Sequence, residues 1–259
     1  MHPALETSLL AAAALVAGGV NAVAGGGSLL VYPSLLAVGL SPLTANGTMT
    51  LALVPGSLAG FWGHRGHLQG TRAWVVAMAL PSLLGGALGT ALALRAGDAA
   101  FGRMVPFLVL GATGLFALAE PIQRRLFVPQ GEGAPQTRGR LAAMALFQTL
   151  VSVYGGFFGA GIGIVMLAAL GLLGHRDIHR MNGLKNLAAA AINAVSSVAW
   201  VLAGRIAWRY GAVMALAAIV GGTLGARLAR RVGPSAVRRA ITVVGTLIGL
   251  VLLARAWRR

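Results

Sequence analysis

The sequence from Ala24 to Pro33, AGGGSLLVYP, interrupts the first long apolar run of the chain with three consecutive glycines. A related stretch, AGIGIVMLAA, begins at Ala160. Glycine permits backbone conformations that other residues avoid, and it lets a second backbone or a ligand approach closely. A short apolar run follows each stretch, at about 28–40 and at about 162–173. We therefore expect each glycine stretch to break a helix.

The composition indicates the class of protein. Of 259 residues, 57% are hydrophobic and 10% are charged, and the mean hydropathy is +0.80. Apolar runs of about 18 residues or more, long enough to cross a bilayer, recur along the chain. A net charge of +16 would suggest nucleic acid in a soluble protein, but here the arginines lie between apolar runs, as membrane anchors do. We expect an all-α, multi-pass protein of the cell inner (plasma) membrane, with the lipid bilayer and not nucleic acid as its surroundings.

The chain reads as two copies of one unit. Glycines and asparagines recur at a constant shift of 136 residues: Gly25 with Gly161, Gly27 with Gly163, Asn46 with Asn182, Gly85 with Gly221, and Gly89 with Gly225. Internal duplication is a common plan for transporters. The sequence predicts a first transmembrane repeat at 1–120, a polar linker loop at 121–140 and a second transmembrane repeat at 141–259.

The two short apolar runs decide the topology. At about 1.5 Å per residue they reach less than ~20 Å, whereas a hydrocarbon core is about 30 Å thick. Each run could extend a broken helix or turn back as a re-entrant half-helix. The basic residues divide almost evenly between the two sides if the chain passes straight through, and about two to one if it turns back. The second arrangement follows the positive-inside tendency. It predicts about eight transmembrane helices plus two re-entrant half-helices, in two inverted repeats with both termini outside.

The breaks also suggest a function. Non-helical backbone at membrane depth must line a cavity or be buried in protein. A break exposes the N-terminus of the next helix, where free N–H groups and the helix dipole favour an anion. The glycines predicted to line a central anion site are Gly25, Gly26, Gly27, Gly161 and Gly163. The alternative is that they only pack helices, which is the interpretation we favour for the glycines at 85–89 and their partners.

Polar side chains near the breaks could complete such a site. Lys185 is the only lysine in the chain, and an ionisable residue inside a membrane is functional by default. Its ammonium group suits an anion, although it could instead reach to the membrane surface as an anchor. The polar residues that could bind the anion beside it are Ser28, Asn46, Thr48, Asn182 and Asn186. Each of these could alternatively form hydrogen bonds between helices.

Other chemistries find little support in the sequence. The five acids all fall at predicted termini, loops or span ends, so we expect no carboxylate site for coupling protons or sodium ions. The absence of cysteine excludes disulfides and thiolate ligands. His175 and His179 are spaced for one helix face, yet no third metal ligand accompanies them. We expect no cofactor and no bound metal. An anion channel, a membrane-embedded enzyme and an assembly factor are the rival functions.

The sequence resembles the TauE/SafE sulfite exporter family, also called the sulfite/organosulfonate transporter family. The stretches that carry the resemblance are GGVNAVAGGGSLLVYPSLLAVGLSP (18–42), ANGTMTLALVPGSLAGFWGHRGHL (45–68) and MNGLKNLAAAAINAVSSVAW (181–200). The resemblance implies an exporter of small anions such as sulfite, sulfoacetate or related organosulfonates, working by alternating access between two repeats. Met49 departs from the family pattern, because it places a thioether where an amide is expected. The coupling, the direction and the oligomeric state, a homo-oligomer included, stay open.

Overall fold

The protein is described by a computed structural model that covers residues 3–23, 25–126, 137–175, 177–228 and 234–257. These residues form helices and short connections, with no strand among them. The elements are α1 (Pro3–Val23), α2 (Ser28–Ala37), α3 (Pro42–His64), the 3₁₀ helix η1 (Arg65–His67), α4 (Arg72–Leu126), α5 (Arg138–Phe157), α6 (Ile162–Leu172), α7 (Ile178–Leu202), α8 (Trp208–Leu228) and α9 (Pro234–Trp257).

The bundle carries large apolar side chains on its surface, and its interior holds buried polar side chains together with an apolar core. Leu84 and Leu146 are 64% and 70% exposed, whereas Lys185 is 1% exposed. The helices α3, α5, α8 and α9 each have 20 to 24 residues, which at about 1.5 Å per residue gives at least ~30 Å. Among the described residues, the segments both long and apolar enough to cross a membrane are Pro3–Ala22, Arg72–Leu118 and Ile178–Leu202. This distribution is that of a multi-pass membrane protein.

The element α4 consists of two helices joined at Gly97. Its φ of 73° and ψ of 166° are not helical, and such a positive φ favours glycine. The sequence predicts a separate loop between apolar runs at 73–94 and 101–119; the structure instead makes the turn at this single glycine. The helix then continues to Leu126, and α5 begins at Arg138, so both ends of the predicted linker are helical. Residues 127–136 of that linker lie outside the described residues.

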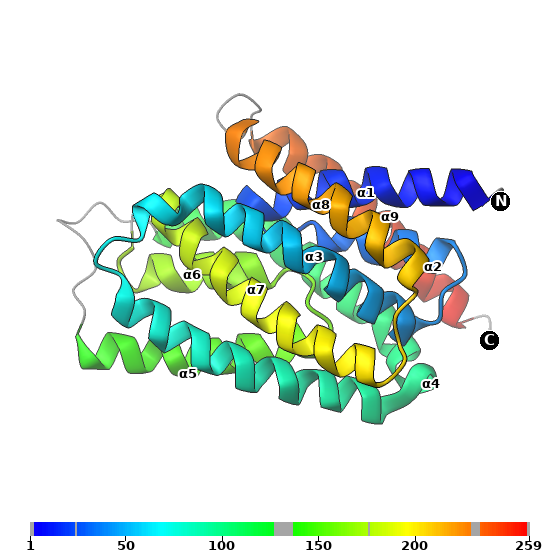
Figure 1. Cartoon of the computed structure of the whole chain (residues 1–259), viewed down its shortest axis with the longest axis horizontal. Helices are drawn as coiled ribbons and strands as arrows, with labels where there is room; N and C mark the ends of the chain where they lie inside the picture. The colour runs from blue at the N-terminus through cyan, green and yellow to red at the C-terminus, as the bar shows by residue number, and fades with distance from the viewer. Residues whose placement is uncertain (1–2, 24, 127–136, 176, 229–233, 258–259) are drawn as a thin grey trace.

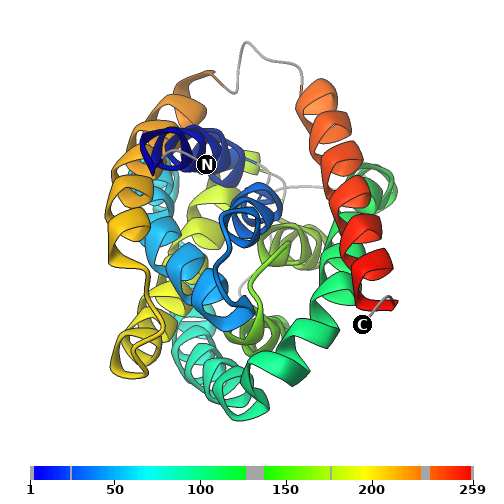
Figure 2. The ribbon, with the colours of Figure 1, turned by 90° about the vertical axis from the view of Figure 1, so that its right-hand side faces the viewer.

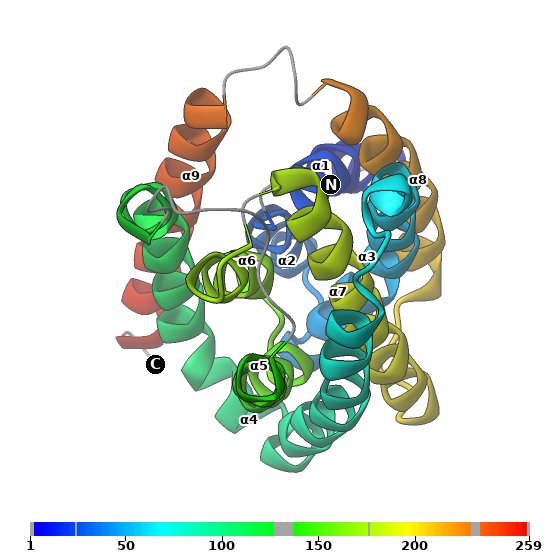
Figure 3. The same cartoon turned by 90° about the vertical axis from the view of Figure 1, so that its left-hand side faces the viewer.

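The chain reverses direction at both glycine stretches, as Figure 1 shows. There α1 runs leftward from the N-terminus and α2 returns rightward, whereas α5 runs rightward and α6 returns leftward. The second reversal brings the end of α6 back to where α5 begins. There Arg140 Nη1 of α5 donates a hydrogen bond to the carbonyl of Leu173, which follows α6, at 3.3 Å. Seen from either end of the bundle, α2 and α6 lie at its centre with longer helices around them (Figures 2 and 3).

Glycines hold two helix pairs together across the two halves of the chain. In the pair α4 and α5, a Cβ atom added to Gly89 would lie 2.0 Å from the carbonyl oxygen of Val153. In the pair α1 and α8, a Cβ atom added to Gly225 would lie 2.4 Å from the Cα atom of Gly19. Both glycines therefore pack helices closely, as the sequence predicts for them. Because α1 and α4 belong to the first half of the chain and α5 and α8 to the second, each half contributes one helix to each pair. Gly89 and Gly225, which pack the two pairs, are 136 residues apart and therefore equivalent.

Candidate functional site

The two glycine stretches meet inside the bundle. Gly25 and Gly161 occupy equivalent positions and have nearly the same left-handed φ, 80° and 79°. A Cβ atom added to Gly25 would lie 2.7 Å from the Cα atom of Gly163, and one added to Gly163 would lie 2.7 Å from the Cα atom of Gly25. The two breaks are therefore in backbone contact, and only glycine leaves room for this approach.

The first break is stabilised by the helices around it. The backbone N–H of Gly27, just before α2, donates to Oδ1 of Asn21 at 2.8 Å, so this side chain of α1 satisfies a donor in the break. A Cβ atom on Gly27 would lie 2.2 Å from the carbonyl oxygen of Ala17, and one on Gly26 would lie 2.3 Å from the ring of Phe116. Gly26 and Gly27 thus face neighbouring protein atoms and allow the chain to turn in a crowded place.

Lys185 reaches this break from α7. Its Nζ atom donates to the carbonyl of Asn21 at 2.7 Å and to Oδ1 of Asn182 at 2.9 Å. Asn186 Nδ2 donates to the next carbonyl, that of Ala22, at 3.3 Å. These carbonyls end α1, where positive charge suits the helix dipole. An ammonium group has three donors, so one remains for a ligand, and no acid within the described residues forms an ion pair with Lys185.

Asn46 of α3 plays the corresponding part at the second break. Its Nδ2 atom donates to the carbonyl of Phe157 at 3.0 Å, and Phe157 occupies the position equivalent to Asn21. The Oδ1 atom of Asn46 is buried and accepts no hydrogen bond from the described residues. Thr48 of the same helix contacts a different part of the chain. Its Oγ1 atom accepts a hydrogen bond from the backbone N–H of Ala207, just before α8, at 2.9 Å.

A small cavity lies between the two breaks. Its volume is about 30 Å³, measured as the space open to the centre of a water-sized sphere. One water molecule needs roughly 10–15 Å³ by that measure, so the space suits a compact ligand. The residues around it are Met49, Thr50, Leu53 and Ser57 of α3; Lys185, Asn186, Ala189 and Asn193 of α7; and Asn21, Gly25, Ser28, Gly159, Ile162 and Gly163 of the breaks and adjoining helices.

The structure brings some of the predicted site residues to this cavity and places others behind it. Those that line the cavity are Gly25, Ser28, Gly163, Lys185 and Asn186. Those outside its lining are Gly26, Gly27, Gly161, Asn46, Thr48 and Asn182. Residues that sequence reasoning did not place in the site include Leu53, Gly159, Ile162 and Ala189. The internal shift would have revealed part of this set, because positions 49, 50, 53 and 57 align with 185, 186, 189 and 193.

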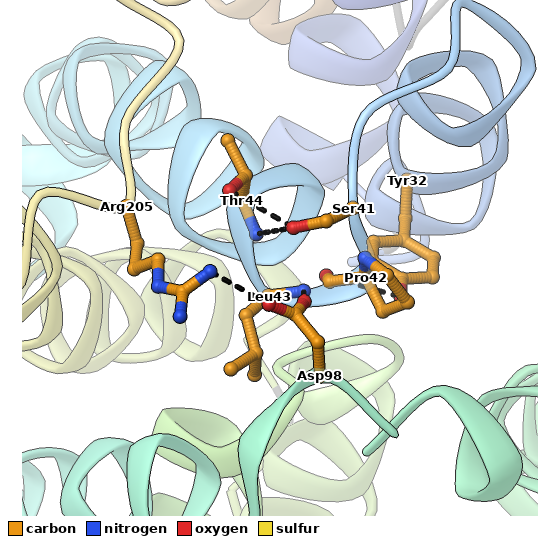
Figure 4. A network of polar contacts seen from close by, with 7 residues as sticks. All are labelled: Tyr32, Ser41, Pro42, Leu43, Thr44, Asp98 and Arg205. Atoms are coloured by element: carbon orange, nitrogen blue, oxygen red, sulfur yellow. Dashed lines mark hydrogen bonds and ion pairs between the residues drawn. The ribbon is translucent and has the colours of Figure 1, made fainter. Parts of the chain in front are cut away.

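A second polar cluster joins the two halves at one end of the bundle (Figure 4). Asp98 accepts hydrogen bonds from the backbone N–H of Leu43 at 3.0 Å and from Nη1 of Arg205 at 2.6 Å. Leu43 is in the first turn of α3, and Arg205 lies between α7 and α8. Burial alone raises the pKa of the Asp98 carboxyl, but the hydrogen bonds from Leu43 and Ser41 and the Arg205 guanidinium together hold this pKa below its ordinary value.

Three histidines gather where α3 ends and α7 begins. The ring centroids of His64 and His179 are 5.5 Å apart, and those of His67 and His179 are 4.9 Å apart. The Nδ1 atom of His67 is 3.6 Å from Oδ2 of Asp177. Within the described residues, no three metal-ligating side chains are arranged to hold a metal ion.

The spacing of His175 and His179 predicts that they share a helix face, and the structure shows that this prediction is wrong. His175 precedes α7, and its ring packs edge-on against Trp74 with centroids 4.5 Å apart. Its side chain is buried, and this burial, together with the charge of Arg180, lowers the pKa of His175 to about 4. The difference arises because α7 starts only at Ile178, so that helical spacing does not apply to position 175.

Known proteins resemble this chain along nearly its whole length. A family model described as "Sulfite exporter TauE/SafE" matches residues 10–252. A "Probable membrane transporter protein" of Haemophilus influenzae is 34% identical over 256 residues, which cover 93% of this chain and 92% of that protein. The "Probable membrane transporter protein YfcA" of Escherichia coli K12 is 28% identical over 244 residues, which cover 93% of this chain and 87% of that protein. The chain therefore belongs to the sulfite exporter TauE/SafE family.

Proposed function

We propose that this protein transports small anions, such as sulfite, sulfoacetate or related organosulfonates, and that it does so at the cavity between the two glycine breaks. The observation that carries the proposal is the environment of Lys185. This single lysine is buried at a cavity in the centre of an apolar bundle, with one donor left over and no acid beside it in the part of the chain that the structure describes. A buried charge without a counter-ion is costly, and a bound anion would compensate it.

The cavity offers further groups that suit an anion. The side chains of Ser28, Asn186 and Asn193 line it, and these supply hydroxyl and amide donors. The N-terminus of α6 begins at the same place, and its first turn has no side-chain cap. Free amides at a helix N-terminus bind anions. Family membership, with relatives that are named as probable membrane transporters, supports transport as the outcome of such binding.

The mechanism that we propose is alternating access between two inverted repeats. The short helices α2 and α6 would act as re-entrant half-helices. Their support comes from the two chain reversals in opposite directions and from the equal φ angles at Gly25 and Gly161. The reciprocal helix pairs α4–α5 and α1–α8 add to it. One half moving against the other would expose the cavity to each side of the membrane in turn.

Uptake into liposomes tests this function. We would measure labelled sulfite with sulfonates and carboxylates as competitors, with and without a membrane potential, because a monovalent anion gains about 2.3 kcal/mol per 100 mV. We expect saturable, potential-sensitive flux that Lys185→Ala abolishes. Arg209→Ala is the matched control, since Arg209 is an exposed cation at the start of α8, away from the cavity lining. Undiminished flux in a folded Lys185→Ala protein would contradict the proposed site, and absence of flux for every anion in the wild type would contradict the proposed function.

A further inference from the structure

The two walls of the cavity are equivalent in position but not in chemistry. One wall comes from α3 and the other from α7, and every lining residue of one aligns with a lining residue of the other. Lys185 on α7 aligns with Met49 on α3, and Met49 is 2% exposed. The other aligned pairs are Asn186 with Thr50, Ala189 with Leu53, and Asn193 with Ser57. The α7 wall therefore carries the positive charge and both amides, and the α3 wall carries no charge.

The hydrogen bonds behind the walls differ in the same way. Asn182 Oδ1 accepts a hydrogen bond from Lys185 Nζ at 2.9 Å. Asn46 is aligned with Asn182, and its Oδ1 atom is buried without a donor among the described residues. Met49 is aligned with Lys185, and a thioether has no proton to donate. The α3 side thus has an acceptor in the place where the α7 side uses one to hold its ammonium group.

We propose that, among the anions named above, the cavity prefers singly charged organosulfonates with one apolar end, so that these are transported faster than sulfite or the dianion sulfoacetate, and that Met49 sets this preference. The inference rests on the proposed transport of anions. The oxyanion head lies toward Lys185 and the first turn of α6, and the apolar end lies against Met49 and Leu53. A dianion of similar size would place its second charge against these two side chains, which offer no compensating group, and burial of such a charge is costly.

A pair of sulfur oxyanions separates the alternatives. Methanesulfonate carries one charge and a methyl group where sulfate carries a second charge and a fourth oxygen. In liposomes, we expect wild-type protein to take up labelled methanesulfonate at least about tenfold faster than labelled sulfate. The second charge of sulfate would lack a hydrogen bond in the cavity, and the loss of one hydrogen bond to a charged group corresponds to a factor of about ten or more. This measurement requires no variant, and equal rates would overturn the proposal.

Variants at position 49 test whether this residue sets the preference. Met49→Lys adds an ammonium group three residues after Asn46, which is the spacing at which Lys185 donates to Asn182 Oδ1. We expect the sulfate-to-methanesulfonate ratio to rise about tenfold or more. Met49→Leu keeps the position neutral and apolar, so its ratio should match that of the wild type. A melting curve in detergent identifies folded variants. If Met49→Lys does not fold, Met49→Gln supplies a neutral donor to the same oxygen, and a smaller rise in the ratio is expected.

The outcomes distinguish the proposed selectivity from the proposed transport of anions. An unchanged ratio in folded Met49→Lys or Met49→Gln protein would overturn the role of Met49. Equal fluxes of both anions that are lost in Lys185→Ala would leave transport at this site standing and remove the selectivity. Absence of any anion flux in wild type would remove both.

Discussion

Replacement of Gly25 by alanine tests the contact between the two breaks. An L-residue at a φ of 80° costs roughly 1–2 kcal/mol. The added Cβ atom would also lie 2.7 Å from the Cα atom and 2.9 Å from the carbonyl carbon of Gly163, and backbone atoms cannot rotate away. Overpacking of this kind typically costs about 1–3 kcal/mol. Together these effects should lower the free energy of unfolding by about 2–5 kcal/mol.

Gly161→Ala is the matched control, because the two glycines have almost the same backbone conformation. Gly161 has a φ of 79°, but the nearest atom to its added Cβ would be the Cβ of Ala112 at 3.5 Å, an ordinary contact. Only the strain of roughly 1–2 kcal/mol is then expected. The difference between the variants, about 1–3 kcal/mol, corresponds to roughly 2–4 °C in apparent melting temperature for each kcal/mol.

Intrinsic fluorescence during heating in detergent would measure both variants beside the wild type. The expected order of apparent melting temperature is wild type, then Gly161→Ala, then Gly25→Ala. If Gly161→Ala were as damaging as Gly25→Ala, the close approach of Gly25 to Gly163 would contribute nothing. If Gly25→Ala melted like the wild type, the two breaks would not touch in the folded protein.

Other predictions concern the ends of the bundle and its helix pairs. Asp98→Asn should lower the free energy of unfolding by about 1 kcal/mol at pH 7, because it removes the charge that pairs with Arg205. Since the folded pKa of Asp98 lies below its unfolded value of 3.8, the wild-type advantage should disappear as the pH falls from about 4 through the lowered pKa; a constant difference in melting temperature across that range would contradict this. The folded pKa of His175 is about 4, below its ordinary 6.5, so the wild type should lose stability between pH 6.5 and 4, and His175→Phe should lose less; parallel pH curves would show the reasoning to be wrong. Gly89→Ala should destabilise by about 1–3 kcal/mol, since its Cβ would meet a carbonyl oxygen of α5, whereas Gly111→Ala, which has open space, should be neutral or slightly stabilising; similar melting temperatures would refute this difference.

The helical, membrane-spanning class and the two helix breaks could be predicted from the sequence, because both depend on local properties. Mean hydropathy along a run and the conformational freedom of glycine act over a few residues. The start of α2 at Ser28 and of α6 at Ile162 agree with the predicted short runs to within a residue. At Gly97 a single residue makes the turn, so the loop expected between 94 and 101 is in the right place but longer than the structure needs.

Hydropathy and glycine positions along the chain thus established that this is a broken-helix membrane bundle with one lysine near a break, since these signals need no knowledge of distant neighbours. Which side chains face the cavity depends on the rotation of each helix about its own axis, and packing against other helices sets that rotation. Asn46 and Thr48 are two residues apart on α3, yet one holds the end of α5 and the other the start of α8. The contact of Gly25 with Gly163 and the burial of the Asn46 Oδ1 atom without a donor likewise exist only when both halves of the chain are packed together.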